Sequence, residues 1–227
     1  MDSSLTRRSL LGHVLPMFAF LGLLGLVSLC KNEHGGFWSA HPEFWIYPGQ
    51  TFVCLALLVW FRDCYEEVWL PGGIIFTFVI ASAVFLLWIA PQQFLHFAPR
   101  WDGFDPTAMT TPVSYWTTLL LRFFRLVVIV PLVEEIFWRG FLLRFLINER
   151  FEAVPFGKFT WFSFLAVAIC FCFSHSRPDW IGAFITGALY NLVAYRTRSL
   201  GSCVLAHALT NLFLGLWIME TRQWGFW

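Results

Sequence analysis

Three ionisable residues inside an apolar run constrain this chain more than any other feature of its sequence. Glu134, Glu135 and Arg139 stand between Leu126–Val130 and Phe141–Leu143, two stretches that are typical of a membrane span. Each ionisable side chain placed in hydrocarbon costs about 2.5–3.5 kcal/mol on insertion scales. Because such a cost needs a compensating role, we predict that this group is functional.

The composition indicates a polytopic membrane protein. Of 227 residues, 58% are hydrophobic and only 13% are charged, whereas soluble domains have about 25% charged residues. Backbone groups inside a bilayer must be paired within the chain, so the predicted fold is all-α, a bundle of transmembrane helices. A net charge of +1 argues against the basic face that nucleic-acid binding needs. The expected partner is therefore the lipid bilayer and not nucleic acid.

Seven apolar stretches are candidate spans. Their predicted ranges are Leu11–Leu29, Ile46–Phe61, Gly73–Ala90, Leu120–Phe145, Phe159–Ser174, Trp180–Tyr195 and Leu200–Met219. The stretch from Tyr115 to Arg125 is a candidate for an extra interfacial helix, so we expect about seven or eight transmembrane helices. Pro131 lies in the middle of the fourth span, where it frees a backbone carbonyl and favours a kink.

We expect a single integral-membrane domain over residues 1–227. Residues 1–118 would supply N-terminal helices and a loop, and residues 119–220 would form the catalytic core. The first span is expected to be retained, because no clear small-residue cleavage site follows it. The distribution of Lys and Arg among the loops favours a cytoplasmic N-terminus.

The spacing of the charged group predicts one ion pair and one carboxylate left over. On a helix, residues four apart share a face, whereas neighbours diverge by about 100°. Glu135 and Arg139 should therefore pair, with the acid first, which is the favourable order. Glu134 should face another direction, toward a polar interior. The alternative is that all three residues form an ion-pair clasp between helices.

Two histidines and one amide accompany the carboxylates. His175 ends the fifth predicted span, while His207 and Asn211 are four residues apart and share one face of the last span. Taken singly, His175 suits a helix terminus, and the His207–Asn211 pair equally suits a polar clamp between helices. Asn191 is expected to be a packing hydrogen-bonder.

Together these groups suit hydrolysis by an activated water molecule. A desolvated Glu134 with a histidine can deprotonate water, and a second histidine with an amide donor can hold the oxyanion of a tetrahedral intermediate. The alternative is one divalent metal such as zinc, bound by Glu134, His175 and His207, whose bound water attacks. The sequence contains neither His-Glu-x-x-His nor Gly-x-Ser-x-Gly. The cofactor is left open.

At these residues the sequence resembles the CPBP family of intramembrane proteases, the CAAX-protease and bacteriocin-processing group that is also called the Abi family. Three motifs match in order and spacing between Leu120 and Leu216. They are Glu-Glu-x-x-x-Arg at Glu134, Glu135 and Arg139, Phe-x-x-x-His at Phe171 and His175, and His-x-x-x-Asn at His207 and Asn211.

The resemblance implies an intramembrane endopeptidase that cuts a membrane-associated or lipidated, CAAX-type protein or lipopeptide. Glu134 and His175 would activate the water, His207 and Asn211 would stabilise the oxyanion, and Glu135 with Arg139 would support them. The family is described both as metalloproteases and as metal-free glutamate enzymes. The chain also resembles bacterial CAAX-protease-related proteins linked to exosortase systems, which implies the bacterial inner membrane.

Two other function classes remain open from the sequence. In a proton-coupled transporter, Glu134, His175 and His207 would form a proton relay. Such transporters usually show repeated halves with paired broken helices, and no second half is visible in this sequence. The other class is a non-catalytic membrane scaffold built on the protease fold, although every motif position is intact.

Overall fold

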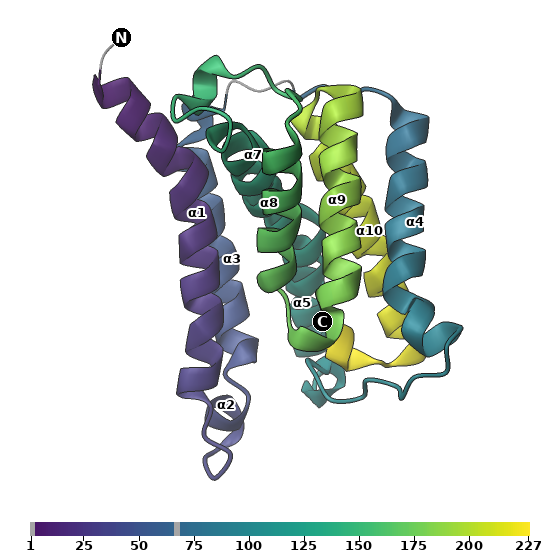
Figure 1. Ribbon diagram of the computed structural model, residues 1–227. Coiled ribbons are helices and arrows are strands. Elements are labelled where there is room, and N and C mark those ends of the chain that lie inside the picture. Colours follow the sequence, from purple (N-terminus) through teal and green to yellow (C-terminus); the bar gives the residue numbers. More distant parts are fainter. Residues whose placement is uncertain (1–2, 66–68) are drawn as a thin grey trace. The chain divides into compact units, whose positions relative to one another are not determined.

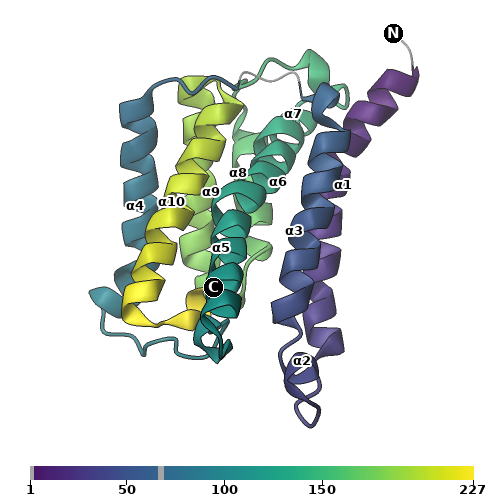
Figure 2. The same cartoon turned by 180° about the vertical axis from the view of Figure 1, so that it is seen from behind.

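The computed structural model describes residues 3–65 and 69–227, and no strand occurs among them. The predicted all-α class is confirmed (Figures 1 and 2). The described chain forms two compact units that alternate along the sequence. The first unit comprises residues 3–65, 99–133 and 215–227, and the second comprises residues 69–98 and 134–214. The single domain expected over residues 1–227 stays a prediction.

The first unit is built around two long helices, α1 (Ser3–Cys30) and α3 (Glu43–Trp60), which pack side by side (Figure 2). The side-chain amide of Gln50 on α3 donates a hydrogen bond of 2.6 Å to the Phe20 carbonyl on α1. The other elements of this unit are α2 (Phe37–Ala40), η1 (Arg62–Cys64), η2 (Pro106–Ala108), α5 (Pro112–Phe124), η3 (Arg125–Ile129) and η7 (Trp224–Phe226).

The second unit packs three helices next to one another. Helix α9 (Trp180–Thr197) lies against both α4 (Ile74–Gln93) and α8 (Trp161–Phe173) (Figure 1). Gly187 allows the close approach of α8, because a Cβ atom there would lie 3.2 Å from Ala168 Cα and 3.2 Å from Phe171 Cβ. The shorter elements of this unit are η4 (Ile136–Leu142), α7 (Leu143–Phe145), η5 (Phe151–Ala153) and η6 (Arg177–Asp179).

Two helical stretches continue from one unit into the other along the chain. They are α6 (Val130–Glu135) and α10 (Leu200–Thr221). Through α6, the chain is helical without interruption from Pro112 to Phe145.

The helix that carries the charged group contains two π-helical stretches. The first, η3, ends directly before α6, which contains Pro131, and the second, η4, begins directly after Glu135. A π-helical turn has i→i+5 hydrogen bonds in place of the i→i+4 bonds of an α-helix, and it often occurs at functional sites. The position of the kink that the sequence predicts at Pro131 therefore coincides with an irregular segment of this helix.

A separate interfacial helix over Tyr115–Arg125 is not present, and that expectation was wrong. A capping box in which Thr111 and Ser114 exchange side-chain and backbone hydrogen bonds starts α5 at Pro112. No break then separates α5 from the segments that follow, so these residues form the beginning of the long helix.

Four helices of the described chain are long and apolar enough to cross a membrane. They are Arg7–Cys30, Ile74–Gln93, Pro112–Phe145 and Leu200–Thr221. The predicted spans Ile46–Phe61, Phe159–Ser174 and Trp180–Tyr195 are helical, as α3, α8 and α9, but do not meet this criterion. The chain is therefore a helical integral membrane protein, and the predicted count of seven or eight spans is not confirmed.

Candidate active site

Glu135 is the centre of a buried polar cluster in the second unit. Its side chain is fully buried, and its Oε1 atom accepts hydrogen bonds from Arg139 Nη1 at 3.0 Å and from His207 Nδ1 at 2.8 Å. The first bond is the ion pair predicted from the four-residue spacing. The second joins residues 72 positions apart in the chain, which the sequence analysis did not foresee.

Arg139 ties this centre to two neighbouring helices. Its Nε atom donates to Asn191 Oδ1 at 3.2 Å, and its Nη2 atom donates to the Gly187 carbonyl at 3.1 Å, both on α9. The Asn191 amide donates in turn to the Phe164 carbonyl on α8 at 3.0 Å. A buried charge is tolerated when it is paired and its donors are satisfied, and Arg139 meets both conditions.

One ring nitrogen of His207, Nδ1, is hydrogen-bonded to Glu135, and the other, Nε2, is not used by that contact. A carboxylate at neutral pH only accepts hydrogen bonds, so the contact with Glu135 puts a proton on Nδ1 of His207. The ring also lies against Tyr190, with centroids 5.3 Å apart. The Tyr190 hydroxyl donates to Thr210 Oγ1 at 2.8 Å, which fixes the aromatic wall beside the imidazole.

His175 has the same arrangement at the end of α8. Its Nδ1 atom lies 2.9 Å from the Phe171 carbonyl oxygen, which can only accept, so Nδ1 carries the proton. In neutral His175, Nε2 therefore carries the lone pair. The Phe171 ring at 4.8 Å and the Trp88 ring at 5.7 Å flank the half-buried imidazole. The motif residue Phe171 thus supplies both a carbonyl and a ring.

Glu134 differs from its neighbour. The Oε2 atoms of both carboxylates are buried and have no hydrogen-bond partner among the described residues. The difference is that Glu135 Oε1 is bound by Arg139 and His207, whereas the half-buried Glu134 takes part in neither contact. A buried polar atom without a partner is rare in native structures and calls for a functional explanation. Glu134 is therefore the carboxylate of the two that Arg139 does not neutralise.

Asn211 follows His207 by one turn of α10 and is half-buried. Its predicted amide contribution to an oxyanion site stays a prediction, as do the catalytic roles of Glu134, His175 and His207.

Comparison with family models gives an independent result for this part of the chain. Residues 115–213 match the family described as type II CAAX prenyl endopeptidase Rce1-like. This segment is Rce1-like. The comparison with curated proteins found no match, and the comparison with solved structures found none either.

The Rce1-like segment covers somewhat less than half of the chain and contains all six predicted site residues. It confirms the resemblance to the CPBP group for that segment. The matched family is described as one of prenyl endopeptidases. The finer resemblance to members linked to exosortase stays a prediction.

The Rce1-like segment does not present a zinc site. Zinc needs three or four His, Cys or carboxylate ligands converging at about 2.0–2.3 Å, and among the described residues no three such side chains form a group that could hold a metal. Glu134, His175 and His207, the predicted ligands, are thus not gathered for coordination. Glu135 instead occupies Nδ1 of His207.

Some members of the cluster were not predicted as site residues. Asn191 was expected only to form a packing hydrogen bond, and neither Tyr190 nor Gly187 was among the predicted site residues. An intramembrane tyrosine directly before an asparagine was a visible signal. The Gly187 carbonyl was not foreseeable, because a backbone acceptor carries no side-chain signature.

Proposed function

We propose that this protein is an intramembrane endopeptidase that hydrolyses a peptide bond of a membrane-associated or lipidated protein, of the CAAX type. The observation that carries the proposal is the unpartnered, buried Oε2 atom of Glu134 inside the Rce1-like segment. Glu135 also has an unpartnered Oε2 atom, but its Oε1 atom is paired with Arg139 and His207, whereas Glu134 is not part of that ion-paired group.

The first step is activation of water. Glu134 accepts a proton from the attacking water, and His175 assists through the lone pair on Nε2. The resulting hydroxide adds to the carbonyl carbon of the scissile bond. When the tetrahedral intermediate collapses, the C–N bond breaks and the same proton passes from Glu134 to the leaving nitrogen. The products are a carboxylic acid and an amine, which ionise to a carboxylate and an ammonium group.

The second element is stabilisation of the oxyanion. When His207 carries protons on both ring nitrogens, Nε2–H is the donor and the Glu135 carboxylate, 2.8 Å from Nδ1, stabilises the positive ring. The Asn211 amide would be the second donor. Glu135 and Arg139 are positioning residues here, because they fix the ring without touching the substrate.

The direct test is cleavage of a prenylated CAAX lipopeptide by the full-length protein in nanodiscs. Glu134→Gln should abolish cleavage while leaving the melting temperature unchanged, since the lost oxygen has no partner in the fold. Glu220→Gln is the matched control, because that carboxylate is exposed at the end of α10. Normal cleavage by Glu134→Gln would refute the water-activation role, and neither a transporter nor a scaffold predicts the loss.

The proposal also includes the location of the protein and its orientation in the membrane. A bacterial inner-membrane location with a cytoplasmic N-terminus follows from the resemblance and from the loop charges. Protease accessibility of an N-terminal tag in inverted and right-side-out vesicles measures that orientation.

A further inference from the structure

The first unit contains a second charged group inside an apolar helix, separate from the protease motifs. Arg122 on α5 is only 3% exposed, and its Nε and Nη1 atoms are buried without a hydrogen-bond partner among the described residues. A buried guanidinium with unsatisfied donors is costly, so the position indicates a group that binds an anion.

The surroundings of Arg122 are aromatic. Its guanidinium carbon lies 4.9 Å from the ring centre of Tyr47, 4.8 Å from that of Phe104 and 5.5 Å from that of Trp227. Ring faces attract the cation, and the Tyr47 side chain also forms a hydrogen bond with the guanidinium, but Nε and Nη1 have no partner among the described residues. The cage therefore holds the charge in place and leaves donors available to a ligand.

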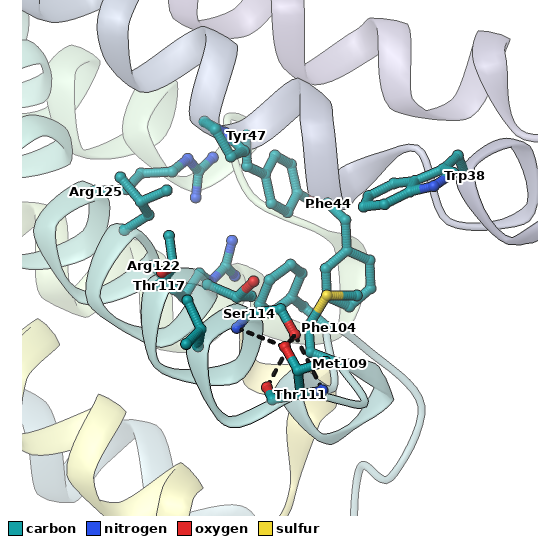
Figure 3. Close-up of a pocket in the computed structure, with 14 residues that line it drawn as sticks. Trp38, Phe44, Tyr47, Phe104, Met109, Thr111, Ser114, Thr117, Arg122 and Arg125 are labelled. Carbon is teal, nitrogen blue, oxygen red and sulfur yellow. Dashed lines mark hydrogen bonds between the residues drawn. The ribbon is translucent and has the colours of Figure 1, made fainter.

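Arg122 lines a cavity of about 370 Å³ (Figure 3). The other lining residues combine an apolar wall with hydroxyl groups and a second arginine: Trp38, Phe44, Tyr47, Pro48, Phe104, Met109, Thr111, Val113, Ser114, Thr117, Thr118, Leu121 and Arg125. A cavity of this size suits a small molecule or a lipid headgroup.

The polar groups follow one face of α5. Ser114 and Thr118 on α5, Leu121 after them and Arg125 at the start of η3 recur every three or four residues, so they share a side of the helix and line the cavity together with Arg122. The Nε atom of Arg125 donates to Gln50 Oε1 at 2.8 Å, which fixes the second cation. Figure 3 shows both guanidinium groups beside the Tyr47 ring.

We propose that this cavity binds the phosphate of an anionic membrane lipid, with Arg122 as its principal donor. Planar guanidinium groups match phosphate oxygens well. Thr111 and Ser114 are used in the capping box, so the hydroxyls of Thr117 and Thr118 supply the further donors. The apolar wall suits the glycerol and first methylene groups. Depth agrees with a headgroup: the continuous helix of 34 residues is about 51 Å long, more than the roughly 30 Å of hydrocarbon. Its terminal turns, which include Ser114, therefore extend beyond the hydrocarbon, and Arg122, about 15 Å along the helix from Pro112, lies near the hydrocarbon boundary, within reach of a headgroup phosphate.

The experiment measures lipid binding to the full chain purified in a neutral detergent. Phosphatidylglycerol, phosphatidylcholine and soluble glycerol 3-phosphate are titrated separately, with native mass spectrometry for stoichiometry and the melting temperature for stabilisation. We expect saturable binding of one phosphatidylglycerol and a rise in melting temperature. Phosphatidylcholine should bind at least tenfold more weakly, because its choline cation opposes two arginines.

Three variants distinguish binding in this cavity from a general attraction of the lipid to the positive charges of the protein. Arg122→Gln should weaken phosphatidylglycerol binding at least tenfold. Thr118→Phe should do the same by filling the cavity while keeping both arginines. Arg62→Gln removes an exposed charge of the same unit and should bind as the wild type does.

Three other outcomes of this experiment would overturn the proposal. Equal binding by wild type and Arg122→Gln excludes this cavity, and equal binding of both lipids excludes anion recognition. Saturation by glycerol 3-phosphate at the same concentration as the lipid would identify a free phosphate site instead. None of these results bears on cleavage, so the proposed protease function stands or falls separately.

Discussion

Two regions of this protein each bury an arginine in an apolar helix, and they treat it differently. Around Arg139 in the second unit, Glu135 neutralises the charge, and Asn191 and the Gly187 carbonyl accept the other donors. Around Arg122 in the first unit, aromatic rings surround the charge and two nitrogens stay unpaired. The arginine of the second unit is therefore paired within the protein, whereas the arginine of the first unit keeps donors for an external anion.

The largest effect is expected from Arg139→Leu, which leaves Glu135 as an uncompensated buried charge. We expect a loss of about 3–5 kcal/mol in stability, seen as a large drop in melting temperature in detergent. The double variant Glu135→Leu with Arg139→Leu should recover most of that stability, because both charges are gone, yet stay inactive. A single variant as stable as the wild type would show that the pair is not needed for the fold.

The next effect concerns catalysis rather than folding. His207→Gln should lower kcat by about 10²–10³-fold, the usual consequence of losing one oxyanion donor, with little change in KM. The melting temperature should fall only slightly, since Arg139 still neutralises Glu135. An equal fall in melting temperature for His207→Gln and Arg139→Leu would instead assign His207 to the clasp.

A smaller effect is expected from Asn191→Leu, which keeps the side-chain volume and removes one acceptor and one donor. Arg139 Nε and the Phe164 carbonyl would lose their partners, so we expect a loss of about 1–3 kcal/mol. Thermal unfolding measures it, and Asn211→Leu on α10 is the comparison. If Asn211→Leu loses activity but Asn191→Leu loses stability, the two amides have separate roles.

The smallest effect is expected from Arg122→Gln without lipid. Removing a charge whose donors are unpaired should change stability by less than about 1 kcal/mol, or raise it, in contrast to Arg139→Leu. The measurement is the melting temperature in neutral detergent. A drop as large as that of Arg139→Leu would mean that Arg122 is also paired within the protein, and the comparison between the two regions would fail.

Local features of the site were predictable from the sequence, and long-range ones were not. The pairing of Glu135 with Arg139 follows from four-residue spacing on one helix, and the helical nature of all seven predicted stretches follows from their apolar runs. The contact between Glu135 and His207 depends on how α10 packs, which no local pattern encodes. The cage of Arg122 likewise joins Tyr47, Phe104 and Trp227 from distant parts of the chain.

The predicted number of spans is not confirmed, for a related reason. Apolar length alone does not separate a helix that crosses the bilayer from one that packs within the protein. Helix α8 is apolar but has only 13 residues, and α9 carries polar residues such as Asn191 that serve the buried cluster.

Gly187 has a consequence for how this protein can change over evolution or in the laboratory. The same residue lets α8 approach α9 and offers its carbonyl to Arg139, so any side chain there would disturb scaffold and catalytic centre at once. Selection for new substrates therefore has little freedom at this position. Variation in specificity should accumulate instead at residues whose backbone the charged cluster does not use.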